Sequence, residues 1–456
     1  MNKNLRRAVS AIALSSLAAT MASCRQQPQL AGNTLGQPTV FGARNATANP
    51  EMQKVDEAVR AGLTAVPGEF NVVMRPGVGA QSLSALGANF TTKNIAPNIV
   101  TVKSNGGVSA QSDQMTLQQL RSNPNVAAVE PNYIITLNDP QINAGAPEAP
   151  RLPAAPNDAL FSKQWHHQTI GSVPAWAKQK GSKNILVAIV DTGMDCGHPD
   201  IAANVDTSKT FSAYNDNGCT DKQGHGTHVG GTVAAVTDNQ IGVAGVAPDV
   251  TLMSAKVLSD SGSGSYASVA AGIVASADAG AKIISMSLGG PSNSAVITEA
   301  IKHAISKGAL PVAAMGNDGN ASLSYPAAIP GVFSVGATDI TNARARFSQY
   351  GPHIDIAAPG VNIMATFPRN ASGMPGKDYG AISGTSMATP IVSGVAALVM
   401  SQNPGISVEQ VKSILKASAV DQGDPGFDNY FGAGIVNAEA ALNASPAGVA
   451  AQRVRR

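Results

Sequence analysis

Apolar residues beyond residue 158 fall into short uninterrupted runs, separated by stretches in which apolar and small residues mix. The run NILVAIV at 184–190 is apolar at almost every position, which is typical of a parallel strand buried on both faces. Strand-like and helix-like stretches then alternate, at 228–236, 250–258, 266–280, 282–288, 295–308, 309–315, 331–338 and 353–360. This alternation predicts an α/β domain over 158–445 with a doubly wound, mostly parallel sheet and a site beyond the carboxyl ends of its strands.

A smaller unit precedes this domain. Residues 67–137 contain the strand-like EFNVVMRP and NIVTVKS, the helix-like SLSALG and MTLQQLRSNPNV, and a closing VAAVEPNYIITL. We expect a small α+β domain that, lacking histidine and cysteine, carries no catalytic group. The polar residues 25–66 predict a flexible lead, the Pro/Ala-rich residues 138–157 an extended linker that is easily cut, and residues 446–456 a tail.

The first 24 residues begin with basic side chains and continue with an apolar run. This order is typical of a signal peptide, so we expect a secreted protein. The run is too short and too rich in Ser and Thr for a membrane-spanning helix, and no later stretch qualifies. Residues 21–24 also resemble a bacterial lipoprotein box, in which Cys24 is lipidated and anchors the protein to the cell envelope. The alternative is ordinary cleavage after Ala22.

Composition excludes several kinds of partner. The 456 residues carry a formal net charge of +2, only 13% are charged, and no basic cluster is longer than the terminal Arg-Val-Arg-Arg. This balance argues against nucleic acid or a membrane surface as a partner. We also expect a monomer. The length predicts two or more domains.

The candidate nucleophile is Ser386, in GTSMATP at 384–390. The apolar stretch 387–400 predicts a buried helix with Ser386 at its N-terminus, where free N–H groups favour an anion and Pro390 fits the first turn. Gly-Thr-Ser alone is equally an ordinary helix cap, so the partners of Ser386 decide. None of the 7 histidines follows Ser386, which excludes the α/β-hydrolase order of serine, acid and histidine.

An aspartate and a histidine upstream complete the set. Asp191, in Asp-Thr-Gly, directly follows the predicted strand 184–190, and an aspartic protease is opposed because no second Asp-Thr-Gly occurs. HGTHVGGT at 225–232 places His225 at the start of a helix, facing the cleft, and His228 inside it as a packing residue. Zinc is opposed because Gly-Thr stands between these histidines, where His-Glu-x-x-His has a glutamate.

A further polar residue follows the predicted strand at 309–315. Asn317 lies in a glycine-flanked loop, where it is either a turn residue or, together with the backbone N–H of Ser386, a donor to an oxyanion.

These four motifs, in this order, make residues 158–445 similar to the subtilisin-like serine proteases. The resemblance implies that Asp191 orients the imidazole, His225 acts as general base and then acid, Ser386 attacks the peptide carbonyl and Asn317 stabilises the oxyanion. The unit 67–137 is similar to the family's inhibitory propeptide. A self-processing zymogen is therefore expected, with its cut in the linker 138–157 and the released domain as an inhibitor.

The resemblance also implies two edges along which a peptide substrate adds as a β-strand, although a strand end and a flexible loop explain these stretches equally well. The edges are formed by Gly262, Ser263 and Gly264, and by Ser287, Leu288 and Gly289. Small walls at Gly289, Ala314 and Gly316 imply broad specificity, with apolar or aromatic residues accepted at the first subsite.

DNQIGVAGVAP at 238–248 resembles the family's calcium loop, with a surface turn without metal as the alternative. The implied hard-oxygen ligands for Ca²⁺ are Asp158, Asp200, Thr237, Asn239, Ile241 and Val243. Cys196 and Cys219 form an even pair in an oxidising compartment, so a disulfide between them is expected, although spacing alone does not establish it.

The sequence thus predicts a secreted serine endopeptidase that hydrolyses protein and peptide substrates through an acyl-enzyme. Two alternatives remain: a catalytically inactive subtilisin-like binding protein, and an esterase, which the absence of a histidine after Ser386 opposes.

Overall fold

The computed structural model describes residues 49–86, 89–140, 147–148, 154–370, 373 and 376–444. The expected signal peptide, Cys24, the start of the expected lead, the tail and most of the linker lie outside the described residues.

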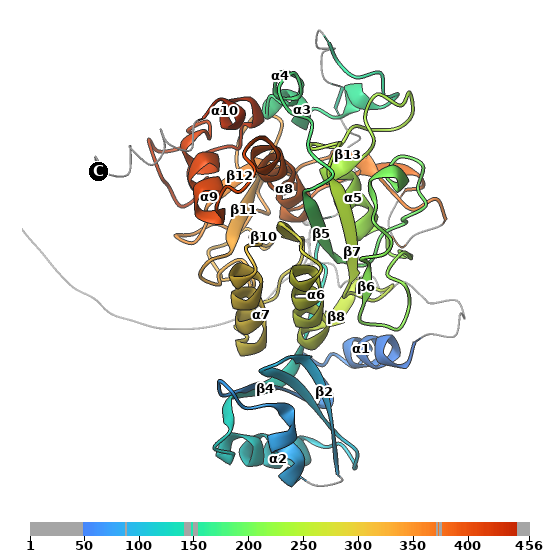
Figure 1. Ribbon diagram of the computed structural model, residues 1–456, viewed down its shortest axis with the longest axis vertical. Helices are drawn as coiled ribbons and strands as arrows, with labels where there is room; N and C mark the ends of the chain where they lie inside the picture. The colour runs from blue at the N-terminus through green and yellow to red at the C-terminus, as the bar shows by residue number, and fades with distance from the viewer. Residues whose placement is uncertain are drawn as a thin grey trace, which may run out of the picture. The chain divides into compact units, whose positions relative to one another are not determined.

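The larger domain is built on a seven-stranded sheet of order β12-β11-β10-β9-β5-β7-β6, in which all neighbouring strands run parallel. β5 comes first along the chain yet lies between β7 and β9, so the chain builds one side of the sheet and then the other. The expected doubly wound α/β fold is confirmed (Figure 1). The strands are β5 (Leu186–Asp191), β6 (Phe211–Ser212), β7 (Thr251–Lys256), β9 (Ile283–Met286), β10 (Leu310–Ala314), β11 (Phe333–Thr338) and β12 (Ile356–Pro359).

Helices cover both faces of this sheet. The longer ones are α5 (His225–Ala234), α6 (Tyr266–Asp278), α7 (Ala295–Ser306), α8 (Thr385–Gln402) and α9 (Val408–Ala417). The shorter elements are η2 (Phe161–Lys163), α3 (His166–Thr169), α4 (Ser172–Trp176), η3 (Ala202–Asn204), β8 (Ser263–Ser265), the antiparallel pair β13 (Ile363–Thr366) and β14 (Tyr379–Ile382), and α10 (Ala438–Asn443).

Alternate side chains of β5 enter two different apolar clusters. Val187 and Ile189 pack in a cluster with residues of α5, α8 and α9. Leu186, Ala188 and Val190 pack in a second cluster with residues of α6 and α7, which lie side by side in Figure 1. Because both faces of β5 are covered, its sequence lacks the alternation of apolar and polar residues that a strand with one solvated face shows.

The smaller domain is an antiparallel sheet of order β2-β3-β1-β4 with the helices α1 and α2. Its last strand, β4, also pairs antiparallel with β8 of the larger domain, so one sheet runs through both domains. The elements are α1 (Pro50–Arg60), β1 (Ala65–Met74), η1 (Ala80–Leu86), β2 (Phe90–Ala96), β3 (Ile99–Ser104), α2 (Ala110–Ser122) and β4 (Val126–Thr136).

The structure differs from the expected boundaries of this domain. α1 and the start of β1 lie within residues 25–66, where we expected a flexible lead. The sequence did contain signals for the start of α1. They are the N-cap Asn49, whose side chain accepts from the N–H of Glu51, and Pro50 in the first turn. β2 was not predicted either, because most of its residues are exposed and it carries no apolar face.

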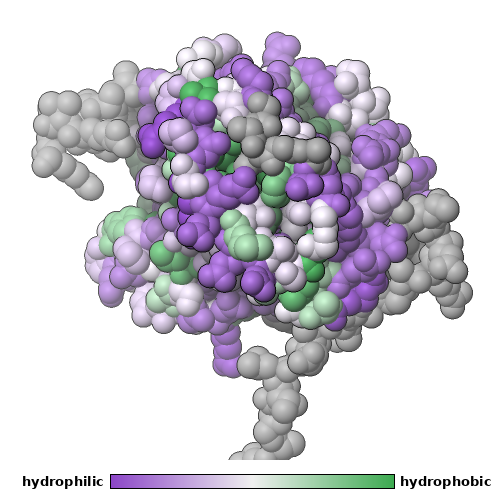
Figure 2. All heavy atoms as spheres, turned by 90° about the horizontal axis from the view of Figure 1, so that it is seen from below, coloured by the Kyte–Doolittle hydropathy of each residue, from purple (hydrophilic) through white to green (hydrophobic). Residues whose placement is uncertain are grey.

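Polar residues dominate the face of the molecule shown in Figure 2, where apolar side chains are scattered in small groups. Among the described residues, no helix is both long enough and apolar enough to cross a membrane.

Candidate active site

The switch point of the sheet brings an aspartate and a histidine together. Asp191 is the last residue of β5 and His225 the first residue of α5. The Nδ1 atom of His225 lies 2.8 Å from Oδ1 of Asp191, and both side chains are fully buried. The N–H of Thr192 donates to the same carboxylate oxygen at 2.7 Å. Asp191 thus lies at the carboxyl end of the first strand of the doubly wound sheet, where sites of such sheets form.

Ser386 lies in the first turn of α8. Its hydroxyl donates to the carbonyl oxygen of Ser287 at 3.2 Å. We expected Pro390 to lie in the first turn of this helix, and this expectation was wrong. Pro390 stands inside α8, four residues after Ser386. A proline there has no N–H to give to the carbonyl of Ser386, and the hydroxyl of Ser287 donates to that carbonyl instead, at 2.7 Å.

Asn317 is held by the start of α8. Its Oδ1 accepts from both the N–H and the hydroxyl of Thr385, each at 2.9 Å, so its Nδ2 points the other way. There Nδ2 donates to the carbonyl oxygen of Asn138 at 3.0 Å and to Oδ1 of Asp139 at 3.2 Å. The amide donor expected for an oxyanion is thus engaged by a peptide carbonyl of the chain itself.

Asp139 also contacts the candidate base. Its Oδ2 lies 2.9 Å from Nε2 of His225, and its side chain is only 8% exposed. Burial by itself would lower the pKa of His225, but the two carboxylates of Asp191 and Asp139 raise this pKa well above the usual value. The imidazole therefore favours the protonated form.

His228 occupies the packing position expected for it. It is fully buried, and its Nε2 lies 2.9 Å from the carbonyl oxygen of Ile363. Burial, and next the charge of His225, lower the pKa of His228 to about 3, so this ring stays neutral.

Asp221 is a buried carboxylate that sequence reasoning missed. Its Oδ1 accepts from the hydroxyl of Thr192 at 3.0 Å and from the N–H of Gly224 at 2.7 Å, while its Oδ2 accepts from the N–H and hydroxyl of Thr227. Asp221 thus joins the residue after Asp191 to the first turn of α5. An aspartate shortly before a predicted helix start was the available signal.

Lys256 is the last residue of β7, and it is fully buried next to this network. Its Nζ donates to the carbonyl oxygen of Thr192 and to Oδ1 of Asp260, the latter at 3.1 Å. Asp260 opens an Asp-Ser-Gly sequence, a second motif of the aspartic-protease type that sequence reasoning wrongly took to be absent, but its carboxylate pairs with Lys256 and Lys222, each at 3.1 Å. Within the described part of the chain, Asp260 therefore pairs with lysines and does not form with Asp191 the carboxylate pair of an aspartic protease.

One of the two expected substrate edges carries a bound strand. Residues Ser263, Gly264 and Ser265 pair with Thr136, Ile135 and Ile134 of β4. The N–H of Leu137 then donates to the carbonyl oxygen of Gly262 at 2.9 Å.

The other expected edge lies where β9 ends. Ser287 contacts Ser386, and Leu288 is buried in an apolar cluster that also contains Ile135. A Cβ on Gly289 would lie 2.5 Å from Oγ of Ser324, and one on Gly316 would lie 1.8 Å from Oε1 of Gln349. A side chain at either glycine would require Ser324 or Gln349 to move, and at Gly316 the φ of 102° also disfavours any residue other than glycine.

A disulfide joins the loops beside the candidate catalytic residues. Cys196 and Cys219 are bonded, with Cα atoms 5.1 Å apart. Cys196 follows Asp191 and Cys219 precedes His225 along the chain, so the bridge ties the two loops together.

The expected calcium ligands lie around two buried carboxylates. Asp200 accepts from Nδ2 of Asn239 at 2.7 Å and from the N–H of Val243 at 2.8 Å. Asp158 accepts from the N–H of Asp238 at 2.9 Å, and its other oxygen, Oδ1, is buried without a hydrogen-bond partner. Burial raises the pKa of Asp200 to about 6, and the charge of Asp158 adds to this effect.

The loop 237–243, which carries the remaining expected ligands, has a positive φ at every second residue from 238 to 242. Asp238, Gln240 and Gly242 have φ values of 65°, 69° and 50°, and the expected carbonyl ligands of Thr237 and Ile241 precede Asp238 and Gly242. Among the described residues no group of three or more His, Cys, Asp or Glu side chains is placed to hold a metal ion. The orphaned oxygen and the two neighbouring carboxylates nevertheless fit a hard cation whose other ligands are neutral oxygens.

Contacts between the two domains extend beyond the strand pairing. Glu130 accepts from the hydroxyl of Ser294 and from the N–H of Ala295 at the start of α7, and Asn132 accepts from the N–H of Ala267 at the start of α6. These helix ends have free N–H groups, which the smaller domain satisfies.

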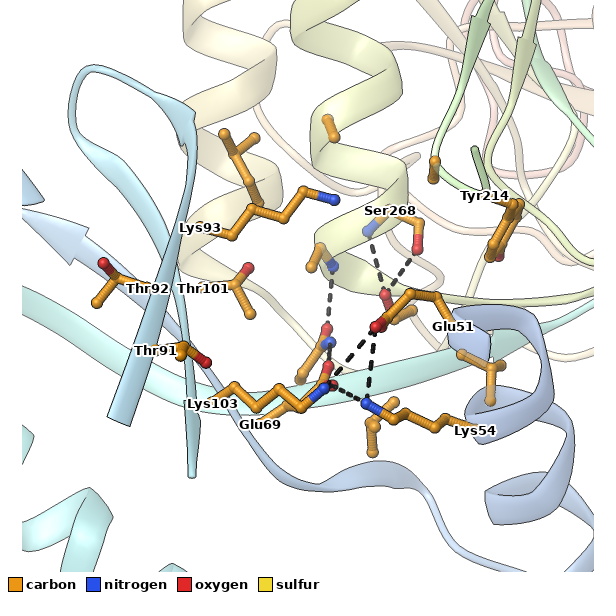
Figure 3. A pocket seen from close by; sticks show the side chains of 18 of the residues that line it. Glu51, Lys54, Glu69, Thr91, Thr92, Lys93, Thr101, Lys103, Tyr214 and Ser268 are labelled. Atoms are coloured by element: carbon orange, nitrogen blue, oxygen red, sulfur yellow. Dashed lines mark hydrogen bonds and ion pairs between the residues drawn. The ribbon is translucent and has the colours of Figure 1, made fainter. Parts of the chain in front are cut away.

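A pocket of about 360 Å³ lies beside these contacts, between the smaller domain and α6 (Figure 3). Glu69 in this pocket accepts from Asn132 at 3.0 Å and lies within 3.9 Å of Lys54 and 4.0 Å of Lys103. Burial raises the pKa of Glu69.

Known proteins resemble this chain over the larger domain. It is 44% identical over 280 residues to Subtilisin Savinase of Lederbergia lenta, a match that covers 61% of this chain and 98% of that protein. It is 41% identical over 288 residues to Thermitase of Thermoactinomyces vulgaris, covering 63% of this chain and 99% of that protein.

Solved structures share the fold as well. Fervidolysin from Fervidobacterium pennivorans, a keratinolytic enzyme related to subtilisin, superposes with a TM-score of 0.73 at 28% identity, covering 84% of this chain and 62% of that chain. A protease of Pseudoalteromonas arctica superposes with a TM-score of 0.56 at 34% identity, covering 63% of this chain and 99% of that chain. The model of the subtilase family matches residues 182–434, more than half of the 456 residues, and the chain therefore belongs to the subtilase family of serine endopeptidases.

Proposed function

We propose that this protein is a secreted endopeptidase that hydrolyses peptide bonds with Asp191, His225 and Ser386 and is made as a zymogen. The observation that carries the proposal is the buried contact between His225 and Asp191, at 2.8 Å, beside a peptide carbonyl held by Asn317. An aspartate that fixes Nδ1 of a histidine leaves Nε2 to exchange protons with a nucleophile.

In the proposed reaction, neutral His225 takes the hydroxyl proton of Ser386 through Nε2 while Oγ attacks the substrate carbonyl carbon. Nδ2 of Asn317 and the N–H of Ser386 donate to the oxyanion that forms. The imidazolium then gives its proton to the leaving amine, and the acyl group stays on Ser386. Water repeats the sequence with the acyl carbon as target, releasing the acid and restoring the serine.

The substrate is proposed to bind as an added β-strand. The pairing of β4 with β8 supports this proposal, because it occupies the edge formed by Gly262, Ser263 and Gly264. Gly289 and Gly316, which carry no side chain, are proposed to form small walls of a first subsite without fixed charge, which suits apolar and aromatic side chains.

The smaller domain is proposed to act as an inhibitory propeptide. In support, β4 fills the substrate edge, Asn138 occupies the proposed oxyanion donor, and Glu130 and Asn132 bind two helix ends. A competing substrate has to displace all of these contacts. Cutting in the linker 138–157 and degradation of the released domain then free the cleft.

Calcium is proposed to bind at Asp158 and Asp200, with oxygen atoms of Asn239, Thr237, Ile241 and Val243. When bound, the ion would offset the negative charge of these two buried carboxylates and stabilise the loop, without taking part in the reaction. Signal-directed export is proposed as well, with the choice between free secretion and a lipid anchor resting on Cys24.

Casein hydrolysis by the secreted protein tests the function, with Ser386→Ala as the matched inactive variant. Casein hydrolysis that depends on Ser386 supports the endopeptidase. Hydrolysis of short-chain esters without any cleavage of casein would favour an esterase, and loss of both activities would favour an inactive binding protein.

A further inference from the structure

The proposed catalytic groups are occupied by two consecutive residues of the same chain. Strand pairing along the edge ends where the N–H of Leu137 donates to the carbonyl oxygen of Gly262 at 2.9 Å. The carbonyl oxygen of Asn138 accepts from Nδ2 of Asn317 at 3.0 Å. The carboxylate of Asp139 lies 2.9 Å from Nε2 of His225. A carbonyl at the oxyanion donor is the one a nucleophile would attack. The peptide bond that follows this carbonyl joins Asn138 to Asp139.

Asp139 also lies where it obstructs the reaction. Its carboxylate contacts both Nε2 of His225 and Nδ2 of Asn317, and a Cβ added to Gly384 would lie 2.7 Å from its Oδ1. The hydroxyl of Ser386 meanwhile donates to the carbonyl of Ser287. Nε2 of His225 therefore faces a carboxylate at the position from which it should accept the proton of the serine.

We propose that the chain cuts itself between Asn138 and Asp139, and that the carboxylate of Asp139 restrains this cut by forming an ion pair with His225. The inference rests on the proposed function, because it assigns the first substrate of the same triad. Asp139 is then a regulatory residue. It belongs to the leaving group, and its carboxylate keeps His225 from acting as a base until the carboxylate moves away.

The reaction balances with one water molecule. After the carboxylate of Asp139 leaves His225 and the imidazolium loses its proton to solvent, the proton of Ser386 passes to Nε2 as Oγ bonds to the carbonyl carbon of Asn138. The C–N bond breaks and the proton goes to the nitrogen of Asp139, which becomes the new amino terminus. Water then cleaves the ester, and Asn138 ends in a carboxylate.

The ion pair also sets how the cut responds to pH. The charged or titratable groups facing His225 are Asp191 from β5 and Asp139 from the linker, with neutral His228 on the same helix and Asp221 bonded to Gly224 just before it. The two carboxylates next to the ring raise the pKa of His225, so the base becomes neutral, and the cut fast, only as pH rises through that raised value. Removing the charge of Asp139 lowers this pKa and moves the rise in rate to lower pH.

The test follows self-cleavage of the full chain, unfolded in denaturant, refolded at low pH and then moved to a series of higher pH values. The mass of the released N-terminal fragment should show an end at Asn138. Asp139→Asn should move the midpoint of the pH–rate profile down by about one unit, so that the cut is about tenfold faster below the midpoint and equal above it. Asp139→Glu, which keeps the charge, should move the midpoint less.

Controls separate this inference from the proposed function. Glu57→Gln, an exposed carboxylate of the smaller domain, should leave the profile unchanged. Cleavage of Ser386→Ala at the normal rate would overturn self-processing by this triad. A cut that needs Ser386 but falls at another bond, or an unchanged profile in both Asp139→Asn and Asp139→Ser, would overturn the present inference alone. Asp139→Ser serves as the second neutral variant if Asp139→Asn does not fold.

Discussion

Ser287 and Ser386 exchange two hydrogen bonds, one from each hydroxyl to the backbone carbonyl of the other, at 2.7 Å and 3.2 Å. The first bond exists because Pro390 has no N–H for the carbonyl of Ser386. Through this pair the segment after β9 fixes the start of α8. A residue assigned to substrate binding from the sequence therefore also positions the proposed nucleophile.

Ser287→Ala should destabilise the protein and slow catalysis. The carbonyl of Ser386 would lose its donor in a buried place, which costs about 1–3 kcal/mol. The hydroxyl of Ser386 keeps its own carbonyl acceptor, so the effect should fall mainly on kcat, through a looser α8 terminus. Urea unfolding of the uncut chain in a Ser386→Ala background gives the stability term, with the exposed Ser322→Ala as control. Equal unfolding midpoints would contradict this role.

The proposed triad should behave as one unit. Ser386→Ala, His225→Ala and Asp191→Asn should each remove most proteolysis, and a double variant should be scarcely worse than Ser386→Ala. Asn317→Leu should lower kcat by about 100- to 1000-fold, a magnitude known from subtilisin itself. Steady-state kinetics on a peptide substrate measure both effects, in variants that added unmutated enzyme has matured separately. Near-normal kcat in Asn317→Leu would remove Asn317 from the reaction.

Local sequence predicted the elements whose residues interact mainly with their chain neighbours. The uninterrupted apolar run before Asp191 and the small-residue helix after His225 identified β5 and α5. β8 escaped prediction because Ser263, Gly264 and Ser265 have little strand propensity and become a strand by pairing with β4, which is distant in sequence.

The parts of the site that sequence could not supply depend on long-range contacts. Lys256 stands in an apolar run, and only the fold places its Nζ against Thr192. In the sequence, Asp139 is an ordinary residue of an Asp-Pro turn. Only the pairing of β4 with β8 places it next to His225. Residue types and motif order thus predicted the candidate site residues, whereas the contact between Asp139 and His225 depends on tertiary structure.

Reducing the Cys196–Cys219 disulfide should lower stability and activity together. The bridge closes a loop with a sequence separation of 23, for which chain entropy alone predicts about 3 kcal/mol. Because this loop runs from just after Asp191 to just before His225, breaking the disulfide should make the positions of both side chains less fixed. A Cys196→Ala/Cys219→Ala variant should unfold at a lower urea concentration than the parent and become insensitive to reductant. A parent protein whose unfolding midpoint does not respond to reductant would contradict this prediction.

Chelation should shorten the half-life of the matured enzyme at elevated temperature. A cation that binds only the native state adds stability by mass action, and without it Asp158 and Asp200 remain close together and buried. Asp200→Asn combined with Asn239→Ala should remove most of the chelator sensitivity. Inactivation at equal rates with calcium and with chelator in the unmutated protein would exclude a stabilising cation at this loop.

The strength of propeptide inhibition should depend on Glu130. Its carboxylate accepts from Ser294 and from the N–H of Ala295 at the start of α7, where the helix dipole favours negative charge. Adding fragment 25–138 to the matured enzyme should inhibit it with a Kd in the micromolar range or tighter, as is typical of specific interfaces. Glu130→Gln removes the charge but keeps an oxygen acceptor, so binding should weaken by about 5- to 30-fold, corresponding to about 1–2 kcal/mol. Glu57→Gln in the same fragment should leave the inhibition constant unchanged, because Glu57 is exposed on α1 and its side chain accepts from Gln53 within the smaller domain. Inhibition constants that agree between Glu130→Gln and the unmodified fragment would show that strand pairing along β8 holds the domain without help from the helix terminus.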